Sequence, residues 1–275
     1  CAASRAAAGG GKLCRNPPEP HCSSDLRGWA KVTSGALTAR PMLNADTPLL
    51  RFTGLTGGYH DTPVLRDLDG AVGAGQTLGV LGRNGVGKTT LLRLLMGYLQ
   101  PFSGEIYWHN KVINNVPTYK RNQLGISYAP QEHAVFDDLS VRDNLVVHLP
   151  SPSLAPYDSY FEAFPRLAQR LHQRAGTLSG GEKKLLSFTR ALAEGSTLIL
   201  LDEPTEGVQE ENIQLMAQLI RVRMRQGAAF LIVEQNLSFL EAIMDEVLVL
   251  DHGRCVARGS ASRYTRETLA SYLQV

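Results

Sequence analysis

The chain has 275 residues, of which 43% are hydrophobic and 20% charged, and its formal net charge is +2. This length allows one large α/β domain or two small ones, with a hydrophobic core that needs no disulfides. The composition excludes collagen-like, coiled-coil and wholly disordered proteins, and the small charge argues against a nucleic-acid partner. Because no apolar run reaches roughly 18 residues, we expect no transmembrane helix.

Residues 1–41 differ from the rest of the chain. They hold six Lys/Arg and two acids, a net charge of +4, so the other residues together carry −2. The segment is rich in Ala, Gly, Ser and Pro, and we expect a disordered or non-native N-terminal extension, with Met42 as the natural start. The alternative is a lipid-modified Cys1. Three of the four cysteines lie in this segment, a distribution that predicts no structural disulfide.

From residue 48 onward, short apolar runs alternate with helical patterns, which is typical of a parallel sheet with crossover helices. Buried strands are predicted over Leu78–Leu81, Thr197–Leu201 and Phe230–Val233. Helices are predicted over Thr89–Met96 and Glu211–Arg225, and a hairpin around the turn at 251–254. Residues 132–178 lack strand patterns and contain several prolines, so we expect a small helical insertion there.

A glycine-rich segment, GRNGVGKT, matches the pattern GxxxxGK[ST] between a predicted strand and a predicted helix. Its glycines let the backbone wrap a phosphate, and free N–H groups at the helix N-terminus point at anionic oxygens. We expect Lys88 to reach the β- and γ-phosphates and the Thr89 hydroxyl to hold Mg²⁺. The alternative is a glycine-rich turn with an exposed lysine. The candidate nucleotide-binding residues here are Gly82, Arg83, Asn84, Gly85, Val86, Gly87, Lys88, Thr89 and Thr90.

A second segment, LILLDEP, ends an apolar strand in two acids. Ligands of α/β sheets bind at the carboxyl ends of the strands, so these acids fall where a bound nucleotide is expected. Asp202 is predicted to coordinate Mg²⁺, directly or through water, and Glu203 to polarise the attacking water. The alternative, a strand that ends in solvated acids, is weakened by the presence of the phosphate loop.

A third motif, Leu178-Ser179-Gly180-Gly181-Glu182, precedes a predicted amphipathic helix. Together with the two segments above, it closely resembles the ATP-binding subunit of ABC transporters, over nearly all of residues 48–275. The resemblance implies an α/β P-loop NTPase fold of the ABC nucleotide-binding type, with a mixed sheet core. The ATP-binding domain would span residues 42–275, with a small helical subdomain at about 132–184.

The resemblance also assigns roles to single residues. Ser179, Gly180 and Gly181 would clamp the γ-phosphate bound to the opposing subunit of a head-to-tail dimer that holds two ATPs, and Glu182 is a further predicted nucleotide-binding residue. By itself Ser179 reads as a helix N-cap, and the two roles are compatible.

Two further positions take their roles from the same resemblance. Tyr59 would stack on adenine, and Gln131 would contact Mg²⁺ and water and relay movement to the membrane subunit. Without the resemblance, Tyr59 would be interpreted as a residue that packs against its neighbours. Gln131 by itself would indicate no function. The predicted metal ligands are Thr89, Gln131 and Asp202.

Two positions depart from the family pattern. Gln235 replaces the usual histidine after the last core strand, and Gln209 replaces the usual aspartate of the loop after Pro204. The Gln235 amide still donates a hydrogen bond but cannot become a cation. The predicted catalytic residues are Glu203, Lys88, Gln131 and Gln235.

The segments VEQN and DEPTEGVQ resemble the ATPase subunits of importers for branched-chain amino acids and of the related importers for urea and short amides. The resemblance implies ATP and Mg²⁺ as cofactors and a peripheral location on the cytoplasmic face of the inner membrane. It implies two integral-membrane permease subunits, a second ABC ATPase subunit and, indirectly, an extracytoplasmic substrate-binding protein as partners. The alternative, motivated by Gln235 and Gln209, is a nucleotide-dependent regulatory or assembly subunit with little hydrolysis of its own.

Overall fold

The computed structural model describes residues 48–132, 134–149 and 151–274. The predictions for residues 1–41, for Met42 as the start and for Cys1 lie outside the described residues. Within the described ranges, no helix combines the length and the apolar character needed to cross a bilayer.

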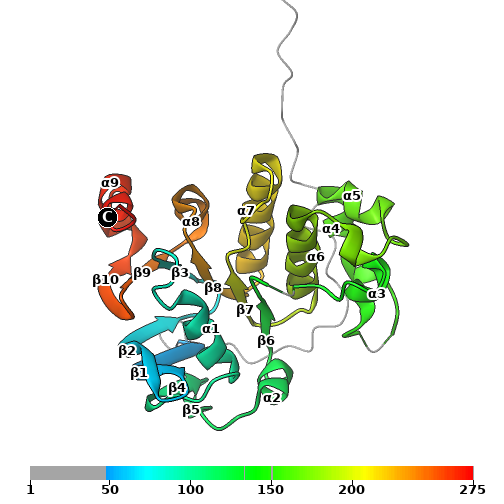
Figure 1. The fold of residues 1–275 in the computed structure, drawn as a ribbon. Helices are drawn as coiled ribbons and strands as arrows, with labels where there is room; N and C mark the ends of the chain where they lie inside the picture. The colour runs from blue at the N-terminus through cyan, green and yellow to red at the C-terminus, as the bar shows by residue number, and fades with distance from the viewer. Residues whose placement is uncertain (1–47, 133, 150, 275) are drawn as a thin grey trace, which may run out of the picture. The chain divides into compact units, whose positions relative to one another are not determined.

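Two β-sheets form the centre of the described chain (Figure 1). The six-stranded sheet has the order β10-β9-β3-β8-β7-β6, and its strands run parallel except for β10, which is antiparallel to β9. Its strands are β3 (Thr77–Leu81), β6 (Ile126–Ala129), β7 (Leu198–Asp202), β8 (Ala229–Glu234), β9 (Glu246–Asp251) and β10 (Arg254–Ser260). The predicted buried strands and the hairpin are therefore confirmed.

The second sheet is antiparallel, with the order β2-β1-β4-β5, and the sequence patterns did not predict it. Its strands are β1 (Leu50–Tyr59), β2 (Thr62–Val72), β4 (Ser103–Trp108) and β5 (Lys111–Val112). The register of β1 against β2 shifts at three places, which breaks the alternation of apolar and polar residues. A side chain at Gly58 would meet the Thr62 carbonyl oxygen at 2.0 Å, so glycine is required there for strand packing and adds no apolar signal.

The helix after the phosphate loop lies between the two sheets. This helix, α1 (Lys88–Met96), contributes five residues to a buried apolar cluster that also draws on β1, β2, β3, β7 and β8. It ends at Gly97, which has a left-handed φ of 77° that favours glycine. Both ends of the loop are therefore anchored in the core, one by β3 and the other by α1.

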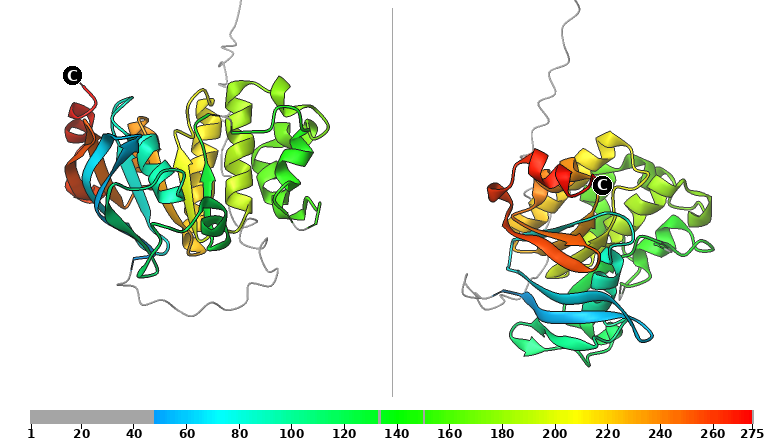
Figure 2. Two further views of the ribbon diagram at one scale, coloured as in Figure 1. Left: turned by 60° about the horizontal axis from the view of Figure 1, so that its bottom comes forward. Right: turned by 60° about the vertical axis from the view of Figure 1, so that its left-hand side comes forward.

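Eight further α-helices follow α1 in the described part of the chain. They are α2 (Thr118–Gln123), α3 (Val141–Val146), α4 (Asp158–Ala163), α5 (Pro165–Gln169), α6 (Gly180–Ala193), α7 (Glu210–Arg225), α8 (Leu237–Ile243) and α9 (Arg266–Ser271). In both Figure 1 and Figure 2, α6 stands between α7 and the group formed by α3, α4 and α5. The described part of residues 132–178 thus holds helices and a single isolated bridge, Ser140 to Arg174.

Candidate active site

The phosphate loop connects β3 to α1 through two glycines in left-handed conformations, Gly85 (φ 81°) and Gly87 (φ 108°). A side chain at Gly87 would approach Leu65 to 2.5 Å, so only glycine fits. No side chain caps the first turn of α1, and the turn contains no acid, which leaves a positive helix end for an anion. The Lys88 ammonium donates to the carbonyl oxygens of Gly82 (2.8 Å) and Arg83 (3.0 Å).

Asp202 ends β7 and is 1% exposed. One carboxylate oxygen, Oδ1, accepts a hydrogen bond from the Thr89 hydroxyl at 3.1 Å, and the other, Oδ2, accepts one from the Tyr128 hydroxyl at 3.0 Å. Burial raises the pKa of Asp202, and the two hydroxyl donors act against that rise. A carboxylate and a hydroxyl in contact form the hard oxygen donor set that Mg²⁺ takes beside nucleotide phosphates, so these residues fit this ion.

Glu203 lies at the centre of the predicted catalytic group. It is 6% exposed and has a left-handed φ of 45°, a strained conformation for a residue with a side chain. Its Oε1 lies 3.0 Å from the Lys88 ammonium and 3.3 Å from Gln235 Nε2, and its Oε2 accepts from Gln131 Nε2 at 2.9 Å. The structure therefore brings all four predicted catalytic residues into contact around one carboxylate.

Tyr59 lies beside the phosphate loop at the end of β1. Its side chain is 37% exposed, and its hydroxyl accepts a hydrogen bond from Arg93 of α1 at 2.9 Å. A cavity of about 290 Å³ is lined by Tyr59, Val64, Asn84, Gly85, Gly87, Lys88, Thr89, Thr90, Gln131 and Glu203. Nine of these ten residues are predicted site residues, so the phosphate loop meets Gln131 and Glu203 at this cavity.

The motif at residues 178–182 lies outside the cavity at the phosphate loop. Ser179 caps α6 through a full capping box: its hydroxyl accepts from the Glu182 N–H at 3.3 Å, and the Glu182 carboxylate accepts from the Ser179 N–H at 3.0 Å. Ser179 and Gly180 are exposed, and a side chain at Gly181 would meet the Gly207 carbonyl oxygen at 2.4 Å. None of residues 179–182 lines the cavity at the phosphate loop.

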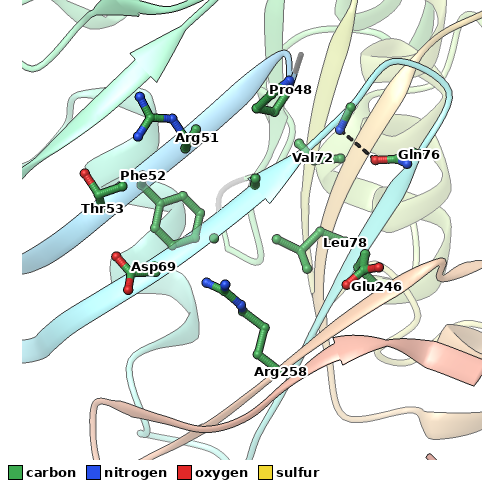
Figure 3. Close-up of a pocket in the computed structure, with 13 residues that line it drawn as sticks. Pro48, Arg51, Phe52, Thr53, Asp69, Val72, Gln76, Leu78, Glu246 and Arg258 are labelled. Atoms are coloured by element: carbon green, nitrogen blue, oxygen red, sulfur yellow. Dashed lines mark hydrogen bonds between the residues drawn. The ribbon is translucent and has the colours of Figure 1, made fainter. Parts of the chain in front are cut away.

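A larger cavity, of about 560 Å³, lies between the two sheets and is lined by residues of β1, β2, β3, β9 and β10 (Figure 3). Its charged side chains include Arg51, Asp69, Glu246 and Arg258. No predicted site residue lines it. The phosphate-loop cavity is therefore identified as the candidate active site by its side chains and not by its size.

The structure adds residues that sequence reasoning missed. Lys184 of α6 is 11% exposed, donates to the carbonyl oxygens of Gln131 (2.8 Å) and Glu203 (3.1 Å), and lies 3.6 Å from Glu206. The adjacent Lys183 instead pairs with Asp137 at 2.8 Å. No local signal distinguishes these neighbouring lysines. Tyr128 lies three residues before Gln131, and nothing in the sequence around it indicates a bond to Asp202.

Glu234, at the end of β8, was also missed. It is 3% exposed, and its Oε1 accepts from both the N–H (2.9 Å) and the hydroxyl (2.6 Å) of Thr205. Its Oε2 accepts from the N–H groups of Gln235 (2.9 Å) and Asn236 (3.1 Å). This carboxylate thus joins the loop after Glu203 to the loop that carries Gln235.

Glu234→Gln is predicted to lower stability by about 2 kcal/mol, because an amide group replaces one acceptor oxygen and faces N–H donors in a buried site. A fall of roughly 4–8 °C in Tm, measured by differential scanning calorimetry, is the expected result. Glu241→Gln is the matched control, because Glu241 is less buried and pairs with Arg266 near the surface. Equal Tm values for the two variants would contradict the role of Glu234.

The profile of the ABC transporter family matches residues 65–206, from β2 to just beyond the acid pair. The chain belongs to the ABC transporter ATP-binding family. Its sequence is 32% identical to a probable branched-chain amino acid transport ATP-binding protein, LivF, of Archaeoglobus fulgidus, over 78% of this chain and 93% of that protein. It is 34% identical to the high-affinity branched-chain amino acid transport ATP-binding protein BraG of Pseudomonas aeruginosa, over 76% and 91%.

An export protein is equally similar to this ABC subunit. The lipopolysaccharide export system ATP-binding protein LptB of Acidithiobacillus ferridurans is 33% identical over 77% of this chain and 90% of that protein. Among solved structures, a nucleotide-free ATP-binding cassette from an ABC transporter matches with a TM-score of 0.69 and 23% identity, over 82% of this chain and 96% of that chain. A bacterial Atm1-family ABC exporter with ATP bound matches with a TM-score of 0.73 and 25% identity, over 86% and 43%.

The predicted fold class is confirmed: this is an ABC ATP-binding cassette with a mixed sheet. The protein is an ATP-binding subunit of an ABC transporter and an ATPase. ATP-binding subunits of this family dimerise and pair with membrane permease domains.

Proposed function

We propose that this subunit powers an importer for branched-chain amino acids, or for the related urea and short-amide substrates. The observation that carries the proposal is the similarity to LivF and BraG, which extends over three quarters of this chain and nine tenths of theirs. The segments VEQN and DEPTEGVQ support the same assignment. The subunit would sit on the cytoplasmic face of the inner membrane, held there by two permease subunits that receive a substrate-binding protein on the other side.

In this proposal, the phosphate loop and Lys88 bind the β- and γ-phosphates of ATP. Lys88 is already oriented over the loop by the Gly82 and Arg83 carbonyls. Thr89, Asp202 and Gln131 hold Mg²⁺, which neutralises charge on the phosphate oxygens when bound. Tyr59 stacks on adenine at the edge of the same cavity.

Glu203 is the general base of the proposed reaction. Gln131 and Gln235 contact its two oxygens, one from each side, so they fix the direction of the carboxylate. A water placed between Glu203 and the γ-phosphate would lose its proton to Glu203 as its oxygen attacks the γ-phosphorus, and the bond from that phosphorus to the bridging oxygen would break to release ADP. Gln235 also donates to Asn84 of the phosphate loop at 2.5 Å, which ties the loop after β8 to the nucleotide site.

The motif at residues 179–182 serves a second ATPase subunit. Ser179 and Gly180 are exposed at the N-terminus of a 14-residue helix and do not line the cavity at their own phosphate loop. A helix N-terminus with an exposed hydroxyl and glycine N–H groups binds an anionic phosphate. This geometry supports a head-to-tail pair in which each subunit completes the site of the other.

Uptake measurements on a strain that lacks this chain test the proposed substrate class. Uptake of radiolabelled leucine, isoleucine and valine is expected to be lost and to return with the wild-type chain but not with Glu203→Gln. Loss confined to urea or acetamide would instead assign the amide substrates. Normal uptake of all of these, together with retention of an envelope lipid inside the cell, would overturn import in favour of export.

A further inference from the structure

Both oxygens of the Asp202 carboxylate are held by hydroxyl groups. The Thr89 hydroxyl comes from α1 and the Tyr128 hydroxyl from β6, the strand beside β7 in the sheet. Because Asp202 is 1% exposed, solvent cannot replace either donor. A buried carboxylate oxygen without a partner is costly, so the loss of one donor would leave the carboxylate free to rotate towards another.

We propose that Tyr128 is a positioning residue that orients Asp202 for the metal ion of the ATP complex. The proposal rests on the metal-binding role proposed for Asp202. The Tyr128 hydroxyl holds Oδ2 on the β6 side and so turns Oδ1 towards Thr89, the other proposed metal ligand. Partners that orient a ligating carboxylate typically change metal affinity or activity 10–100-fold when they are removed.

The ring of Tyr128 is held independently of its hydroxyl. It packs against the apolar cluster between the sheets and against the ring of Tyr98, with ring centroids 6.1 Å apart. The strand that carries it pairs in parallel with β7, with Tyr128 opposite Leu200, two residues before Asp202. The backbone and the ring thus fix the position of the hydroxyl, which is the arrangement expected of a group that orients another.

Tyr128→Phe removes one oxygen and keeps the ring, which makes it the decisive variant. The matched control is Tyr98→Phe, because the Tyr98 side chain is 58% exposed and its hydroxyl has no hydrogen-bond partner within the described residues. Mn²⁺ serves as the probe, measured by electron paramagnetic resonance on the full chain with protein in excess over ADP. Nucleotide affinity in EDTA, measured with a fluorescent ADP analogue, shows whether the fold and the phosphate loop of each variant are intact.

We expect Tyr128→Phe to weaken Mn²⁺ binding by about 10–100-fold while nucleotide affinity in EDTA stays within about twofold of wild type. Tyr98→Phe should match wild type in both measurements. Unchanged Mn²⁺ affinity in Tyr128→Phe would overturn the inference, and so would an equal loss of nucleotide affinity in EDTA, which would indicate a structural role. Asp202→Asn tests the metal-binding role of Asp202 separately from the positioning role of Tyr128. If Asp202→Asn leaves Mn²⁺ binding intact, the metal-binding role of Asp202 is wrong.

Discussion

Glu203→Gln is expected to reduce ATP turnover by about 10²–10⁴-fold while nucleotide binding persists. The substitution removes the group that would accept the proton of the attacking water, yet it retains the shape of the side chain and its position beside Gln131. It also removes the negative charge that lies 3.0 Å from the Lys88 ammonium. Lys88 then interacts with phosphate alone, so ATP affinity is expected to equal or exceed that of wild type. Phosphate release and equilibrium binding of a fluorescent ATP analogue measure the two effects.

The control for this prediction is Glu206→Gln. Glu206 lies three residues further on and also contacts Gln131, at 3.3 Å, but its side chain is 60% exposed. Its removal is expected to change turnover by less than about threefold, because exposed ion pairs contribute little. If Glu203→Gln kept wild-type turnover, the general-base assignment would be wrong, and Glu203 would instead be a structural partner of Lys88.

Arg121→Leu is expected to produce the largest loss of stability, about 3–5 kcal/mol. Arg121 is fully buried, and its guanidinium donates five hydrogen bonds of 2.7–2.9 Å, all to backbone carbonyl oxygens. The acceptors belong to Leu94, Leu95, Ile113, Asn114 and Val116. Leucine fills part of the space but leaves these five carbonyls without that donor.

The charge of Arg121 also matters. Burial lowers its pKa to about 10, which still leaves the guanidinium protonated at neutral pH. Two of its acceptors, Leu94 and Leu95, are in the last turn of α1, where a cation is favoured by the helix dipole. Arg121 therefore holds the end of the helix whose beginning forms the phosphate site, so its loss should also weaken nucleotide binding.

Urea unfolding followed by circular dichroism measures the stability effect of Arg121→Leu. Lys120→Leu is the control, because Lys120 is the preceding residue of α2 and is exposed. Its stability is expected to stay within about 0.5 kcal/mol of wild type. A similar midpoint for both variants would show that the five carbonyls find other partners, and the assigned role of Arg121 would have to be abandoned.

The sequence patterns predicted parallel strands of the six-stranded sheet but did not predict the antiparallel sheet. Strands β3, β7 and β8 are buried on both faces, so they appear as uninterrupted apolar runs that are easily recognised. Strand β1 contains three glycines and several register shifts, so its pairing with β2 and β4 left no alternating pattern. The antiparallel sheet was consequently missed, although it covers the helix that carries the phosphate loop.

The residues of the candidate site also differ in how well the sequence predicts them. The loop at residues 82–89 and the acid pair Asp202-Glu203 were found because their chemistry depends on residues adjacent in sequence. Glycines at fixed spacing, a lysine at a helix start and two acids at a strand end are local features. Gln131 and Gln235 took their roles from a family resemblance, since an isolated glutamine has no pattern of its own.

The sequence by itself determined the backbone conformations of the phosphate loop, the burial of the parallel strands and the presence of an acid pair at a strand end. Each of these depends on residues a few positions apart. Only the tertiary structure decided that Lys184 and not Lys183 faces the active site, that Tyr128 bonds to Asp202, and that Arg121 binds the end of α1. These partners are 27–74 residues apart in sequence, and packing of separate elements brings them within hydrogen-bonding distance. A buried polar group needs a hydrogen-bond partner, and the packing of separate elements determines which group supplies it. No local sequence pattern encodes that pairing.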